Sequence, residues 1–164
     1  MLELIGTARH SSLLAIVLGG FLAGTIDIGA AALINNASPV VILKFIAGGL
    51  LGRPALAGGA FVAVLGFALQ LAMSLVIAAI YVVAAGRWLP VLRRRWIAGG
   101  FAYGVVVFFV MNYVVVPLSA WAKWPRFTVD NFAENMLAML LFGVIVAGFA
   151  RYYSSGATPQ RRSV

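Results

Sequence analysis

The chain has 164 residues, of which 63% are hydrophobic and only 10% are charged. A soluble domain carries roughly 25% charged residues, so the composition indicates an integral membrane protein. It excludes a cytosolic enzyme, a secreted domain and a protein that reads the grooves of a nucleic acid. Because the sequence has one histidine and no cysteine, we expect no haem, no zinc centre and no other cofactor.

The first apolar stretch, residues 11–34, is long enough to cross a bilayer, which takes about 20 helical residues. The segment that follows is too apolar for a plain loop, and Ser38 with Pro39 is typical of an N-cap and a first helical residue. We predict a short helix over residues 39–51, in the outer interface or folded back onto the other helices. It is either a packing plug or a lid over a site.

Three further apolar stretches of spanning length follow, at residues 59–85, 97–118 and 131–153. Pro117 closes the third, because proline cannot continue a helix. Asn131, with Glu134 three residues later, is a capping-box variant at the start of the fourth. We therefore predict an all-α polytopic membrane protein in which four transmembrane helices form one domain, residues 1–153. A disordered cytoplasmic tail at 154–164 is expected after it.

The distribution of lysine and arginine predicts the orientation. If the N-terminus is inside, the inner segments carry eight of these residues and the outer loops carry four. Both termini are then cytoplasmic. The strongest single anchor is the run of Arg93, Arg94 and Arg95 before the third span. This run either sets only the topology or also binds an anionic lipid headgroup.

Each predicted span carries one polar residue in its outer half: Asp27, Gln70, Asn112 and Asn135. An ionisable residue inside a span is costly and is therefore a candidate functional residue. Residues at helical spacing share a face, and each of the four lies on a stripe of small or polar residues. The simplest bundle turns all four stripes inward and brings Asp27, Gln70 and Asn112 together.

Such a cluster allows three interpretations. In a dry bundle without a cationic partner, Asp27 favours its neutral form and can donate to Asn112 or Gln70, which would hold the helices in register. If water, Lys44 or Arg53 reaches Asp27, the carboxylate would ionise and could relay protons or cations. The third interpretation is a pocket for a lipid or small molecule.

The motif GGFxxG occurs in the first and third spans, 80 residues apart (from Gly20 to Gly100). Small residues let helix backbones approach closely, so its glycines are candidate helix-packing residues: Gly20, Gly24, Gly100 and Gly104. The recurrence reflects either a duplicated two-helix unit or shared packing chemistry. The second and fourth spans show no comparable match.

Three segments carry a resemblance to known proteins: GGFLAGTIDIGAA, SPVVILKFIAGGLLGR and YGVVVFFVMNYVVVPLS. Over roughly residues 19–117 the chain resembles a group of small bacterial inner-membrane proteins of no established activity. It is also distantly similar to the YagU-like inner-membrane proteins, which are linked to acid resistance. The resemblance implies a bacterial inner-membrane location and transfers no catalytic residue. The link to acid resistance would fit a protonatable Asp27.

These observations favour a non-enzymatic accessory or scaffold protein. Its partners would be the lipid bilayer and either another membrane protein or a second copy of the chain, with no nucleic acid. One alternative is a protein that translocates protons or small solutes at Asp27, and a second is a lipid- or isoprenoid-binding protein. A membrane enzyme ranks low because the sequence lacks paired intramembrane acids and metal ligands.

Overall fold

The structure is a computed structural model that describes the backbone of residues 2–155 and the side chains of residues 11–153. Its long helices are α1 (Leu2–Ile34), α3 (Ala60–Arg87), α5 (Trp96–Val110) and α7 (Val129–Ser155). Four apolar segments in this part of the chain can span a membrane: Ser11–Ile34, Ala60–Arg87, Trp96–Leu118 and Val129–Tyr153. The predicted all-α fold, with four membrane-length helices and a short helix, is confirmed.

The short helix α2 (Pro39–Leu51) has the predicted bounds. Ser38 is its N-cap, and the Ser38 hydroxyl accepts a hydrogen bond from the backbone N–H of Val41 at 3.4 Å. The helix ends at Gly52, whose positive φ of 72° suits glycine. A 3₁₀ turn, η1 (Arg53–Ala57), then leads into α3.

The third span continues through Pro117 by changing its helical pitch. After α5 the chain forms a π-helical segment, η2 (Met111–Val115), and then α6 (Val116–Leu118). Proline lacks an N–H, and its ring crowds the carbonyl group four residues earlier in a helix. A π-helical turn relieves this crowding because it widens the backbone before the proline. The N–H of Val116 accordingly donates to the carbonyl of Met111, five residues back.

Several helix boundaries differ from those predicted. Helix α1 begins at Leu2 rather than 11, and α3 covers Ala60–Arg87 rather than 59–85. Both ends of α7 differ as well. Helix α7 begins at Val129 rather than 131, because the Thr128 hydroxyl accepts from the N–H of Asn131 at 3.3 Å and takes the capping position. The same helix extends to Ser155, so residues 154 and 155 are helical rather than part of the tail. The rest of the predicted tail, 156–164, lies outside the described residues.

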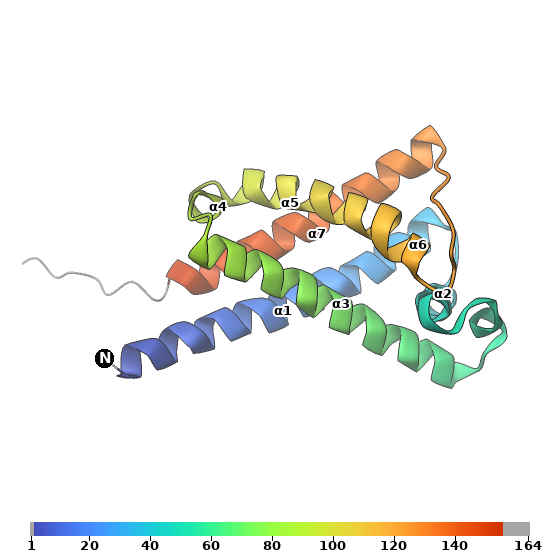
Figure 1. Ribbon diagram of the computed structural model, residues 1–164, viewed down its shortest axis with the longest axis horizontal. Helices are drawn as coiled ribbons and strands as arrows, with labels where there is room; N and C mark the ends of the chain where they lie inside the picture. Colours follow the sequence, from blue (N-terminus) through green and yellow to red (C-terminus); the bar gives the residue numbers. More distant parts are fainter. Residues whose placement is uncertain (1, 156–164) are drawn as a thin grey trace, which may run out of the picture.

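The main contacts between the long helices join α3 to α1, α1 to α7 and α7 to α5, and α2 rests on α3. Figure 1 shows α3 crossing α1. The start of α1, the short helix α4 (Val91–Arg94) and the end of α7 lie at one end of the molecule, here called the arginine-rich end. Helix α2 lies at the opposite end, called the α2 end. The small-residue stripes of α1 and α5 face different helices, because Gly20 packs on α3 and Gly100 packs on α7. The prediction that all four stripes converge on one axis is therefore wrong.

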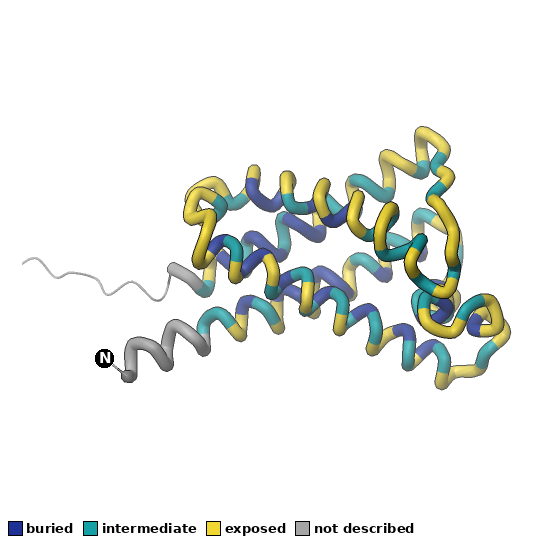
Figure 2. The backbone as a smooth tube through the Cα atoms, in the orientation of Figure 1, coloured by how far each residue is buried: buried dark blue, intermediate teal, exposed yellow. Residues whose placement is uncertain are grey.

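Buried residues follow the faces where the helices meet, and the outer faces are exposed (Figure 2). The main core lies between α1, α3 and α7, and comprises Ala15, Ala23, Ala78, Tyr81, Val82, Ala85, Phe142, Val146, Ala147 and Ala150. A second cluster at the α2 end joins α1 to α2 through Ile28, Ala32 and Ile42. The exposed outer faces carry large apolar side chains, as a helix surface in contact with lipid does.

Candidate functional site

The contact between α1 and α3 is made by the glycines of the first GGFxxG motif. A Cβ atom on Gly20 would lie 3.1 Å from the Cα of Leu75. A Cβ atom on Gly24 would overlap the Ser74 side chain. These two α1 glycines therefore allow the close backbone approach that small residues provide in membranes.

Asp27 and Gln70 meet at this contact, one turn beyond Gly24. The Nε2 of Gln70 donates a hydrogen bond to Oδ2 of Asp27 at 2.9 Å. Gln70 is buried, as is Ser74 one turn further along α3. The bond, called here the Asp27–Gln70 pair, thus joins two helices that already touch through their glycines. Two of the four predicted polar residues are brought together.

Helix α2 packs on both α1 and α3 beside the Asp27–Gln70 pair, on the side of the α2 end. The carbonyl of Leu43 packs directly on Gly66, which lies one turn before Gln70 on α3. On the α1 side, Ile42 packs with Ile28, the residue that follows Asp27. Helix α2 therefore bridges α1 and α3 next to the pair.

The loop before α7 holds α2 in this position. The indole N–H of Trp121 donates to the carbonyl of Phe45 at 3.0 Å, and the two rings stack with centroids 4.5 Å apart. The same indole lies against Gly48, where a Cβ would overlap it. In addition, the N–H of Ala120 donates to the carbonyl of Gly49 at 2.8 Å. These contacts favour the plug interpretation of α2 over a mobile lid.

Asn112 and Asn135 make their hydrogen bonds elsewhere. The Asn112 amide donates to the carbonyl of Phe108 at 2.9 Å, within its own helix. The Asn135 amide donates to the carbonyl and side-chain oxygen of Asn131, at 2.8 and 3.1 Å. The prediction that Asn112 joins Asp27 is wrong. Asn112 lies on η2, which continues α5, and α5 packs on α7 rather than on α1.

The second GGFxxG motif packs α5 on α7. A Cβ on Gly100 would lie 2.8 Å from the Cα of Val144, and one on Gly104 would lie 2.8 Å from the Cα of Leu140. Gly143 of α7 faces Gly104 in turn, at 3.0 Å from its added Cβ to the Cα of Gly104. Each motif therefore contacts the next long helix of the chain, so all four predicted packing glycines lie at helix contacts.

Two features in the half of the molecule toward the arginine-rich end could not be predicted from the sequence. The hydroxyl of Tyr103 on α5 donates to the carbonyl of Ile77 on α3 at 2.7 Å, and its ring lies 5.0 Å from that of Tyr81. An open groove also lies along α7. The sequence shows only that Tyr103 lies among apolar residues. Its hydrogen bond could not be predicted, because the acceptor is a backbone carbonyl of another helix, α3.

Arg93, Arg94 and Arg95 are exposed at the turn between α3 and α5. Arg93 approaches the end of α3, where its Nη2 would lie 3.1 Å from a Cβ on Gly86. Arg151, near the end of α7, places its guanidinium 5.8 Å from the centroid of the Trp96 ring. Within the described residues, no three acidic or histidine side chains gather in a way that could hold a metal ion.

Comparisons of the chain with family models, with curated proteins and with solved structures gave no match. The fold nevertheless defines the class of protein. The chain is a multi-pass helical membrane protein with four candidate spans.

Proposed function

We propose that the protein is a non-enzymatic accessory or scaffold protein of a bacterial inner membrane. The observation that carries this proposal is the setting of the Asp27–Gln70 pair. The pair lies in a glycine-mediated contact between α1 and α3, and α2 packs on both helices beside it. A hydrogen bond in that setting holds two helices in register, which is a structural rather than a catalytic task.

The location and orientation rest on two arguments from the sequence. The resemblance to small bacterial inner-membrane proteins supports that membrane. The eight inner against four outer basic residues support cytoplasmic termini. With this orientation, the arginine-rich end faces the cytoplasm and α2 lies at the outer surface.

The outer faces of the bundle offer surface for a partner. Val106 on α5 and Val76 on α3 are more than half exposed, at 55% and 59%. Helix α5 contacts mainly α7, and α3 contacts mainly α1 and α2, so each is a flanking helix with a wide apolar face. A transmembrane partner or a second copy of the chain can pack on either face through van der Waals contact.

Photo-crosslinking tests the accessory role. A photoreactive amino acid is introduced singly at Val106, Val76, Leu18 or Leu141, which are exposed positions on the four spans. We expect one face to give a discrete adduct of fixed stoichiometry with another membrane protein or with a second copy. The remaining positions serve as matched lipid-facing controls and should give lipid adducts only. Lipid adducts alone at all four positions would contradict the proposal.

A second candidate is translocation of protons or small solutes, and Asp27 favours it. Among the described residues, this is the one acid that lies well inside a span, in the outer half of Ser11–Ile34, where a carboxyl group is costly. Its partner is the neutral amide of Gln70. A carboxyl group with a neutral partner can gain and lose a proton without breaking an ion pair.

Vesicles carrying an imposed pH gradient separate the two functions. The native chain and Asp27→Asn are reconstituted at equal density, and the decay of the gradient is followed with a pH-sensitive dye. The accessory proposal predicts equal decay, because neither chain conducts. Faster decay with the native chain, at equal thermal stability of both proteins, would favour translocation and count against the accessory role.

A further inference from the structure

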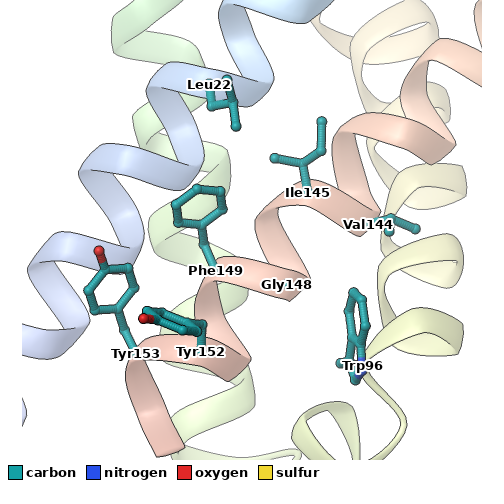
Figure 3. Close-up of a pocket in the computed structure, with 8 residues that line it drawn as sticks. All are labelled: Leu22, Trp96, Val144, Ile145, Gly148, Phe149, Tyr152 and Tyr153. Carbon is teal, nitrogen blue, oxygen red and sulfur yellow. The ribbon is translucent and has the colours of Figure 1, made fainter. Parts of the chain in front are cut away.

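A groove of about 460 Å³ opens on the outer surface of α7, in the half of the molecule toward the arginine-rich end. Figure 3 shows Phe149 and Tyr153 on the side toward α1, and Trp96 on the side toward α5. Its lining is apolar and aromatic and consists of Leu22, Trp96, Val144, Ile145, Gly148, Phe149, Tyr152 and Tyr153.

The groove stays open because Gly148 is small. This residue lies on α7 between the aromatic residues that form the walls (Figure 3). A Cβ added there would lie 3.4 Å from Cζ3 of Trp96, which is ordinary van der Waals contact. A methyl group would therefore fit, whereas a longer side chain would occupy the groove itself.

The groove has the length of an acyl chain in one leaflet. Its lining on α7 runs from Val144 to Tyr153, which at 1.5 Å per residue corresponds to about 13 Å. One leaflet accounts for about 15 Å of the hydrocarbon core. A partner transmembrane helix would need a groove through both leaflets, so the dimensions favour a lipid chain.

Positive charge gathers where the groove reaches the arginine-rich end. The guanidinium of Arg151 lies over the ring of Trp96, one wall of the groove. Arg95 immediately precedes Trp96 and is exposed. Tyr152, which also lines the groove, is largely exposed at this end, as tyrosines at a membrane–water interface are.

We propose that this groove binds an anionic phospholipid. One acyl chain lies along α7 over Gly148, and the phosphate group meets Arg95 and Arg151 at the arginine-rich end. Basic pockets between transmembrane helices at the cytoplasmic side bind anionic headgroups. A zwitterionic phospholipid has the same acyl chains but no net negative charge. The net charge of the headgroup therefore distinguishes an anionic lipid from a zwitterionic one at this site.

Quenching of tryptophan fluorescence by brominated lipids tests the site. Trp88, Trp121 and Trp124 are replaced by phenylalanine, so that the emission of the full-length chain reports on Trp96 alone. The protein is reconstituted in mixtures of phosphatidylglycerol and phosphatidylcholine, with bromine on the acyl chains of one lipid at a time. We expect brominated phosphatidylglycerol to quench Trp96 more strongly, with an association constant several-fold higher than that of phosphatidylcholine.

Four substitutions assign the effect to the groove. Arg95→Gln should lower the preference for phosphatidylglycerol about fivefold, the effect of one basic residue near a membrane surface. Arg93→Gln is the matched control, because Arg93 points toward the end of α3, and it should leave the preference nearly unchanged. Gly148→Leu should weaken quenching by both lipids, whereas Gly148→Ala should not.

Several results would overturn the proposal. Equal quenching by both lipids would show an ordinary lipid annulus without selection. No quenching by either lipid would show that a partner helix or a second copy covers Trp96. Equal effects of Arg95→Gln and Arg93→Gln would show attraction to the surface as a whole rather than a site. Thermal unfolding of each variant confirms that it is folded before the comparison is made.

Discussion

Gly104→Leu is expected to separate α5 from α7 and to cause the largest loss of stability of any substitution proposed for this protein. A Cβ at this position would already lie 2.8 Å from the Cα of Leu140, and it would also meet the carbonyl group of Met139. Backbone atoms cannot rotate away as a side chain can. Even Gly104→Ala should therefore lower the free energy of unfolding by about 1–3 kcal/mol, and leucine should lower it further.

Gly29 provides the matched control for this experiment. It is also a helical glycine, but a Cβ added there would meet nothing within 4 Å. Gly29→Ala should keep or slightly raise the stability, because alanine favours a helix more than glycine does. Unfolding of both variants in mixed detergent micelles measures the difference. If Gly104→Ala is as stable as Gly29→Ala, the close contact between α5 and α7 is not as described.

The helices could be predicted from the sequence because their signals are local. Span length and hydropathy defined the four long helices, and Ser38 with Pro39 defined the start of α2. The start of α7 was displaced because two capping residues lie close together, and Thr128 rather than Asn131 takes the position. Capping preferences alone do not decide which of two neighbouring capping residues begins the helix.

The candidate site could be predicted only in part, because helical spacing shows which residues share a face but not which helix that face meets. The stripes carrying Asp27 and Gln70 do face each other. The stripe carrying Asn112 belongs to a helix that packs on α7 instead. The sequence contains no periodic pattern that predicts the groove. The groove depends on the small size of Gly148 and on Leu22, a residue of α1 that is distant in the sequence.

Asp27→Leu is the second substitution with a large expected effect. It removes the acceptor of the Gln70 amide, which is buried on α3. A buried donor left without a partner costs about 1–3 kcal/mol, so the variant should be destabilised by that amount. Asp27→Asn retains a side-chain oxygen that can accept the same hydrogen bond, and it should unfold nearly as the native chain does.

The most direct test of the structural role of Asp27 is a double-mutant cycle with Gln70. The free energy of unfolding is measured for the native chain, Asp27→Leu, Gln70→Leu and the double variant. Because replacing both partners leaves no polar group unpaired, we predict a coupling free energy of about 0.6–1.7 kcal/mol, the range of hydrogen bonds between membrane helices. Single effects that add to within about 0.3–0.5 kcal/mol would show that the pair does not hold α1 and α3 together, and would contradict a structural role for Asp27.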